Sequence, residues 1–239
     1  MLRKVKKALA PVRRTVNQML GRDVPFRAGY RCQKLRLGTD YGGWTVRPEL
    51  IGSDSIVYSV GIGTDISFDL AMIERFGTIV HAFDPTPKSV EWLASQTLPQ
   101  QFVHYPIGLA DYDGTARFTL PNPDWVSFRM AGETETSVSC PVERLATLMQ
   151  RLGHDRIDVL KMDIEGAEYP VVADILRSKI SITQWLIEYH HTRGNRESLE
   201  KTRASVQSIL DAGYVIFDIA PLGQEYAFCH AGDNAGQGR

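Results

Sequence analysis

The chain has 239 residues, of which 43% are hydrophobic and 23% are charged, a composition ordinary for one globular domain. Its formal net charge of −1 lacks the basic excess typical of nucleic-acid-binding proteins, so a general nucleic-acid binder is excluded. No apolar run approaches the ~20 residues that a membrane span needs, and no early run resembles the apolar core of a signal peptide. The three cysteines show no paired spacing, and a cytoplasmic protein is therefore expected.

The first segment, residues 1–23, is basic, because seven Lys or Arg residues and no acid lie within its first 22 positions. Apolar residues at helical spacing predict an amphipathic helix there. Such a helix can lie on an anionic membrane surface, so peripheral membrane contact through residues 3–22 is one hypothesis, and a solvated helix is the other. Residues 24–54 are interpreted as a cap or lid, and the Gly-, Asn- and Gln-rich tail 231–239 as disordered.

Residues 55–230 alternate short apolar runs with segments of helical periodicity. The predicted strands are 55–60, 78–83, 102–104, 157–162, 183–189, 214–219 and 226–230, and the predicted helices are 65–76, 86–95, 143–152, 167–177 and 197–212. Strands separated by helices pair in parallel, whereas the last two strands lack a helix between them and should pair antiparallel. Residues 111–142 break the rhythm and indicate an insertion or hairpin beside the sheet. The sequence therefore predicts an α/β fold with a doubly wound, seven-stranded, mostly parallel sheet and an antiparallel last strand.

A glycine turn, Gly61-Ile62-Gly63, joins the first of these strands to its helix. Glycines let the backbone turn sharply and approach a ligand closely. Ligands of doubly wound sheets bind beyond the carboxyl ends of the strands, where free N–H groups at a helix start can bind the carboxylate of a methionine moiety. Taken alone, the motif also fits a tight turn without a ligand.

Asp84 ends the second strand, 23 residues after Gly61. An acid at about this spacing can accept the hydroxyl hydrogens of an adenosine ribose, and its alternative role is a helix cap. The turn and the acid together fit a nicotinamide dehydrogenase as well as an S-adenosylmethionine enzyme. However, Asp65-Ile66 follows the turn, so the third glycine of GxGxxG, which packs the helix closely over a pyrophosphate, is missing. S-adenosylmethionine has no pyrophosphate, and the missing glycine therefore favours it.

Acids and histidines follow the next two strands. Asp163 ends the fourth strand, and Glu165 would share its side if the chain stays extended, although Glu165 or Glu168 could equally stabilise the next helix N-terminus. The fifth strand ends in Glu188-Tyr189-His190-His191. Two acids and two histidines on adjacent strand ends predict an acid–base patch. The same groups could hold a divalent metal or only cap the strands.

The stretch Lys161-Met162-Asp163-Ile164-Glu165-Gly166-Ala167-Glu168 resembles the K-x-D-x-E-G-x-E signature of the FkbM-type family of S-adenosylmethionine-dependent methyltransferases. Residues 58–69 are similar to the first motif of a methyltransferase-like branch near that family. The resemblance covers roughly residues 40–230 and implies a class I, Rossmann-like fold and O-methylation, commonly on sugars or secondary metabolites. One departure stands in the first motif, D-x-G-A-N-x-G, where this chain has Ser59, Ile62 and Gly63 at the first D, the A and the N.

By position, the resemblance implies a set of site residues. The implied cofactor-binding residues are Gly61, Gly63, Thr64 and Asp65 around the methionine moiety, Asp84 at the ribose and Gly108 and Leu109 by the adenine, with Asp163 bordering the methyl-transfer centre and Glu188 and His190 nearby as catalytic residues. His190 or Asp163 would take the proton of the acceptor hydroxyl.

The expected acceptor is a small molecule or a saccharide. A divalent cation beside Asp163 is compatible with this chemistry, but a metal site is not predicted. A nucleotide (NAD)-binding oxidoreductase and a non-catalytic cofactor-binding module are the two alternative functions.

Overall fold

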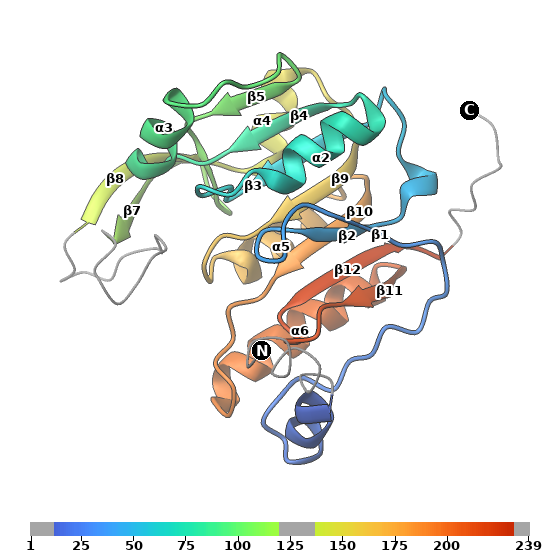
Figure 1. Cartoon of the computed structure of the whole chain (residues 1–239). Coiled ribbons are helices and arrows are strands. Elements are labelled where there is room, and N and C mark those ends of the chain that lie inside the picture. Colours follow the sequence, from blue (N-terminus) through green and yellow to red (C-terminus); the bar gives the residue numbers. More distant parts are fainter. Residues whose placement is uncertain (1–11, 120–136, 232–239) are drawn as a thin grey trace, which may run out of the picture.

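The structure is a computed structural model that describes residues 12–119 and 137–231. Seven strands form its central sheet: β3 (Ile56–Val60), β4 (Ile79–Phe83), β5 (Phe102–Tyr105), β9 (Ile157–Met162), β10 (Ile182–Glu188), β11 (Tyr214–Ile219) and β12 (Glu225–His230). They lie in the order β11-β12-β10-β9-β3-β4-β5, and β12 runs antiparallel to both of its neighbours (Figure 1). The predicted seven-stranded, mostly parallel sheet is therefore confirmed.

Helices and a hairpin cover both faces of this sheet (Figure 1). One face packs against α4 (Leu145–Leu152), α5 (Glu168–Arg177) and α6 (Arg196–Asp211), and the other against α2 (Ser67–Phe76), α3 (Pro87–Ala94) and the hairpin of β1 (Leu35–Leu37) and β2 (Trp44–Val46). Successive strand residues alternate between the two cores: Tyr58 and Leu160 belong to the first, and Val57 and Val159 to the second. Because both faces are covered, the central strands are continuous apolar runs.

The helix after the glycine turn begins two residues later than predicted. Asp65 Oδ1 accepts a hydrogen bond from the Ser67 backbone N–H (3.0 Å), and Asp65 Oδ2 accepts one from Thr39 Oγ1 (2.8 Å). Such short-range side-chain bonds give the backbone an alternative to helical pairing. Residues 61–66 therefore stay a loop at the sheet edge, and α2 starts at Ser67.

The chain order reverses beside β3. From β3 the chain proceeds to β4 and β5, then returns to β9 on the other side of β3. Loops leave the carboxyl ends of β3 and β9 in opposite directions, which opens a crevice there. Between β5 and α4, the strands β6 (Gly108–Leu109), β7 (Gly114–Thr119) and β8 (Ser137–Glu143) form a small separate sheet, confirming the predicted interruption of the rhythm.

The predicted cap, residues 24–54, is packed onto the sheet. Trp44 and Val46 are 5% and 0% exposed and belong to the core on the α2 face. The backbone N–H of Arg47 donates to Gln184 Oε1 of β10 (2.7 Å). This part of the chain is thus joined to the main domain by buried contacts.

The basic first segment is described from residue 12 onward, and residues 12–19 are helical. Its end is anchored by Asp23, which is 2% exposed and lies 3.7 Å from His191 Nε2 and from Arg193 Nε. Residues 1–11, 120–136 and 232–239 lie outside the described residues, and with them the start of the predicted amphipathic helix, part of the predicted insertion at 111–142 and nearly all of the predicted tail. Within the described residues, no helix combines the length and apolar character that crossing a membrane requires.

Candidate active site

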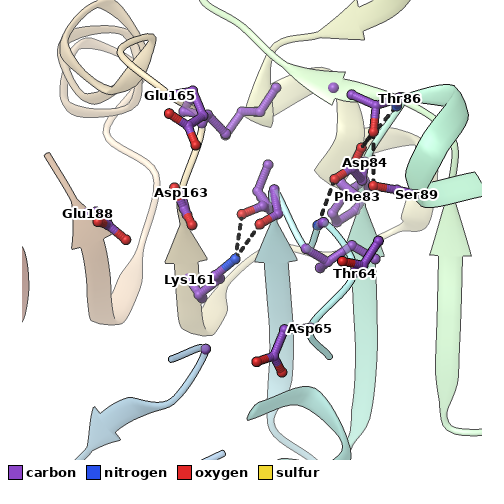
Figure 2. A pocket seen from close by; sticks show the side chains of 18 of the residues that line it. Thr64, Asp65, Phe83, Asp84, Thr86, Ser89, Lys161, Asp163, Glu165 and Glu188 are labelled. Atoms are coloured by element: carbon purple, nitrogen blue, oxygen red, sulfur yellow. Dashed lines mark hydrogen bonds between the residues drawn. The ribbon is translucent and has the colours of Figure 1, made fainter. Parts of the chain in front are cut away.

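A cavity of about 370 Å³ opens at the carboxyl ends of β3, β4, β9 and β10. The predicted site residues that line it are Gly61, Gly63, Thr64, Asp65, Asp84, Gly108, Leu109, Asp163, Glu188 and His190. Figure 2 shows the acids Asp163, Glu165 and Glu188 on one side of the site and Asp84 on the other. The structure therefore brings every predicted site residue to one place, while their individual roles stay predictions.

The glycine turn and the loop after β9 are in direct contact. Gly61 has a φ of +70°, and a Cβ atom there would lie 1.7 Å from the carbonyl oxygen of Asp163. No side chain fits into that space, so Gly61 is required by both conformation and packing. The contact fixes the first ligand-binding loop against the loop that carries the acids.

Asp84 is 5% exposed and already accepts three hydrogen bonds. Its Oδ2 accepts from Gly63 N–H (2.9 Å), and its Oδ1 accepts from the N–H (2.9 Å) and hydroxyl (2.6 Å) of Thr86 (Figure 2). A carboxylate offers about four lone-pair positions, so one position remains for a ribose hydroxyl. Thr86 and Ser89 also line the cavity, and the Thr86 hydroxyl is hydrogen-bonded to the Ser89 hydroxyl (2.9 Å).

Lys161 is a site residue that the sequence reasoning did not assign. It is 6% exposed, and its ammonium donates to the carbonyl oxygens of Val60 (3.1 Å) and Gly61 (2.6 Å) (Figure 2). The buried Asp69 lies near enough for this ammonium to oppose the effect of burial, which raises the pKa of Asp69 to about 6. Lys161 thus fixes the backbone of the glycine turn through its two hydrogen bonds. The lysine of the K-x-D-x-E-G-x-E signature could have drawn attention to this position. The sequence could not reveal its partners, because they are backbone carbonyl groups.

Residues 39–42 reach over the cavity and are held by Asp65. Tyr41 and Gly42 line the cavity, and a Cβ atom on Gly42 would lie 2.6 Å from Asp65 Cγ. Together with its bond from Thr39, this close approach makes Asp65 one of the contacts that attach the cap. The role of Asp65 includes cap attachment, which the sequence did not suggest.

His190 is surrounded by three carboxylates. Its Nδ1 lies 2.8 Å from Glu168 Oε1, and its Nε2 lies 3.3 Å from Glu165 Oε2 and 3.5 Å from Asp163 Oδ1. The reason given for pairing Asp163 with Glu165 was wrong, because Glu165 has a φ of +54° and the chain turns there rather than staying extended. The left-handed turn brings both acids to the same imidazole nitrogen.

These charges perturb one another. Burial opposes a charged His190, but the hydrogen bond to Glu168 and the surrounding carboxylates raise the pKa of His190 to about 10. Burial, and then the charge of Asp163, raise the pKa of Glu188 to about 7. Glu225 of β12 stands directly opposite Glu188 in the sheet, and burial raises its pKa as well. This side of the cavity therefore gathers several carboxyl groups around one imidazole.

The inclusion of His191 in the acid–base patch was wrong. Its side chain is fully buried, with Nδ1 3.3 Å from Thr202 Oγ1 and Nε2 3.7 Å from Asp23. Neighbouring residues of an extended chain point to opposite sides. His190 therefore faces the cavity, and His191 faces the anchor of the first segment.

A family model described as "Methyltransferase FkbM domain" matches residues 56–216, which is more than half of the chain. The chain belongs to this family. The resemblance found in the sequence is thereby confirmed, and the family assigns S-adenosylmethionine as the cofactor. The match favours a methyltransferase over the nicotinamide-dependent alternative.

Curated relatives of this FkbM-family chain include two proteins named "Probable methyltransferase-like protein 24". The rat protein is 28% identical over 136 residues and the human protein is 31% identical over 137 residues, each match covering 56% of this chain and 32% of the relative. The chain thus spans about a third of the length of the curated relatives it matches.

Solved structures similar to this one include two fibrillarins. A pre-rRNA processing fibrillarin of Methanococcus jannaschii has a TM-score of 0.44 at 9% identity, with 88% of each chain covered. The Aeropyrum pernix fibrillarin with natively bound S-adenosyl-L-methionine has a TM-score of 0.41 at 12% identity, with 86% of this chain and 84% of that chain covered.

The residues present fit the cofactor that the family assigns. The cavity of about 370 Å³ lies within the roughly 300–1,000 Å³ usual for small-molecule sites. Asp84 accepts three hydrogen bonds and keeps one acceptor position for a ribose hydroxyl. Phe83 and Phe118 also line the cavity and supply apolar surface for an adenine ring near Gly108 and Leu109.

Proposed function

We propose that the protein transfers the methyl group of S-adenosylmethionine to a hydroxyl group of a saccharide or secondary metabolite. The observation that carries the proposal is that one cavity joins the glycine turn and Asp84 to the carboxylates of Asp163 and Glu188. The first pair suits the cofactor, and the second suits a hydroxyl-bearing acceptor. The acidic wall formed by Glu188 and Glu225 favours an uncharged polyhydroxyl acceptor over an anionic one.

When bound, S-adenosylmethionine supplies a methyl group on a sulfonium, which is already a strong electrophile. The work of the protein is therefore alignment, which can supply roughly 7–11 kcal/mol of a barrier. The free acceptor position of Asp84 would hold the donor, while the amides of Gly61 and Gly63 donate to Phe83 and Asp84 and, together with Lys161, keep the turn in place. Glu188 accepts the proton of the acceptor hydroxyl, because its carboxylate lies in the cavity beside Asp163 (Figure 2).

Cofactor binding is tested by calorimetry with S-adenosylhomocysteine and with NAD on the full chain. We expect binding of S-adenosylhomocysteine only, and loss of that binding in Asp84→Ala, with an unchanged circular dichroism spectrum. Thr147→Ala, in which a hydroxyl remote from the cavity is removed, is the matched control and should bind normally. Binding of NAD alone would support the oxidoreductase.

Methyl transfer is tested with radiolabelled S-adenosylmethionine and a panel of sugars and polyhydroxylated small molecules. We expect label in at least one acceptor, and at least about 100-fold slower transfer by Glu188→Gln, since general-base catalysis contributes roughly 10²–10⁴ in rate. Cofactor binding without transfer to any acceptor would instead identify a non-catalytic binding module.

A further inference from the structure

We infer that Asp163, Glu165 and His190 form a binding site for a divalent cation of the Mg²⁺ and Mn²⁺ class at the acid side of the cavity. Each of the three residues offers one donor atom, a carboxylate oxygen or an imidazole nitrogen, and these atoms lie within 4.8 Å of one another. They come from two loops, which follow β9 and β10. Figure 2 shows Asp163 and Glu165 beyond the end of the same strand, next to Glu188.

The separations of the donor atoms match one small ion. His190 Nε2 lies 3.3 Å from Glu165 Oε2 and 3.5 Å from Asp163 Oδ1. Ligands at about 2.1 Å from an octahedral ion stand about 3 Å apart when adjacent. A contraction of a few tenths of an ångström would bring Nε2 and each carboxylate oxygen to that separation, and the ion would displace the proton that Nε2 otherwise shares with the two acids.

A buried carboxylate outside the set orients the imidazole. Glu168 is 0% exposed, and its Oε1 lies 2.8 Å from His190 Nδ1 while it accepts from the backbone N–H groups of Ile164 (3.3 Å) and Gly166 (3.2 Å). An imidazole that binds a metal through one nitrogen commonly donates the other N–H to such a carboxylate. Glu168 thus leaves Nε2 directed at the two acids.

An unpartnered oxygen points to the ion more directly. Asp163 Oδ1 is shielded from solvent and accepts no hydrogen bond from the described part of the chain, and its contact with His190 Nε2 is 3.5 Å long. A buried acceptor without a partner costs roughly 1–3 kcal/mol, and more when it is charged. The neighbouring ammonium of Lys161 is directed at the carbonyls of Val60 and Gly61. A cation between Asp163 and Glu165 would give this oxygen its partner.

The donor set also selects the ion. Two carboxylates and one imidazole, without a thiolate, suit hard divalent cations better than Cu⁺ or structural Zn²⁺. A cation at this place would polarise an acceptor hydroxyl and lower its pKa. That catalytic role rests on the proposed function, whereas the ion site itself does not.

The test is a titration of the full chain with Mn²⁺. Binding is measured as the decrease of the free Mn²⁺ signal in electron paramagnetic resonance. We expect one Mn²⁺ per chain, displaced by excess Mg²⁺. Asp163→Asn and Glu165→Gln should abolish binding, and Glu168→Gln should weaken it about 10- to 100-fold, as loss of a supporting carboxylate does. Glu197→Gln, an exposed carboxylate on α6, is the matched control and should bind as the wild type does.

The Glu165 side chain is 29% exposed, so Glu165→Gln should fold even if Glu168→Gln does not. Glu165→Gln then tests the ion site by itself. Equal Mn²⁺ binding by the wild type and Glu165→Gln, or no binding by the wild type, would overturn the inference. S-adenosylhomocysteine binding is measured separately in the presence of a chelator. The S-adenosylhomocysteine measurement tests only the proposed function. The Mn²⁺ titration tests only the ion site.

Discussion

At the scale of single residues, Gly61 and Gly63 look alike in sequence but differ in surroundings. Both have positive φ angles, +70° and +55°. A Cβ atom on Gly61 would meet the Asp163 carbonyl at 1.7 Å, whereas one on Gly63 would meet nothing within 4 Å. The two glycines therefore separate the cost of backbone strain from the cost of a steric clash.

We expect Gly61→Ala to lower the free energy of unfolding by about 2–4 kcal/mol and to reduce S-adenosylhomocysteine affinity at least tenfold. The reason is that the added methyl group must push the glycine turn away from the loop of Asp163. Gly63→Ala should cost only about 1 kcal/mol, which is the price of a left-handed alanine. Urea unfolding and calorimetry measure both quantities, and equal losses in the two variants would contradict the packing argument.

Single residues also show where sequence reasoning stops. Asp84 and Asp163 were placed correctly, because each ends a strand and strand ends meet at one edge of a parallel sheet. The burial of His191 was missed although the alternation of side chains along an extended chain could have predicted it. The roles of Lys161 and Glu168 depend on backbone groups of other loops, and residue types do not disclose those partners.

At the scale of elements, three neighbouring strands gather aromatic rings around a partly buried histidine. The ring centroid of His81 on β4 lies 5.5 Å from that of Tyr58 on β3, 5.9 Å from that of Tyr105 on β5 and 4.8 Å from that of His154. Its Nδ1 is 3.2 Å from the Tyr105 hydroxyl. Burial, and then the charge of His154, lower the pKa of His81 to about 4 from its ordinary 6.5.

This shift predicts a pH dependence of stability. Between pH 6.5 and 4 the unfolded chain binds a proton at His81 that the folded chain does not, so stability falls as pH falls through that window. The slope approaches about 1.4 kcal/mol per pH unit for one proton. In His81→Phe this contribution should vanish, and its urea-unfolding profile should be flatter than that of the wild type from pH 6.5 to 4. Parallel profiles would show that His81 does not titrate in this way.

The helix at residues 12–19 has two faces of opposite character. Arg14 and Gln18, one turn apart, bond the carbonyl oxygens of Phe26 (3.1 Å) and Val24 (2.7 Å). The outward side carries the exposed apolar residues Val12, Val16, Met19 and Leu20, and the exposed Arg13, Arg22, Arg27 and Arg31 lie in the same part of the chain. Apolar and cationic groups together complement an anionic lipid surface.

The membrane hypothesis therefore stays a prediction with a direct test. We expect the full chain to sediment with vesicles that contain phosphatidylserine, and less so at high salt, because each basic residue near the surface contributes about 1 kcal/mol. Val16→Glu with Met19→Glu should abolish binding. Val90→Glu, on the remote α3, is the control. Equal binding to neutral vesicles, or none to either, would contradict the hypothesis.

At the scale of the whole molecule, the seven strands and their mostly parallel pairing could be predicted, because hydrophobic patterns and turn residues along the chain indicated the same fold. Apolar runs buried on both sides, such as Val159-Leu160, alternate with helical segments, and the missing helix between the last strands forces antiparallel pairing. The hairpin that closes the second face was not predicted, since strands of three residues leave almost no periodicity. The family then accounts for the cofactor.

The wall of the cavity extends beyond the part of the chain that the family shares. Tyr41 and Trp44 precede the matched residues 56–216, and Leu222 and Glu225 follow them. Leu222 is itself tethered by Arg193, whose guanidinium donates to its carbonyl oxygen. Under the proposed function, the residues assigned to the donor lie within the matched segment, while part of the surface assigned to the acceptor lies in flanking segments. Two members of this family could therefore share every donor contact and still modify unrelated molecules.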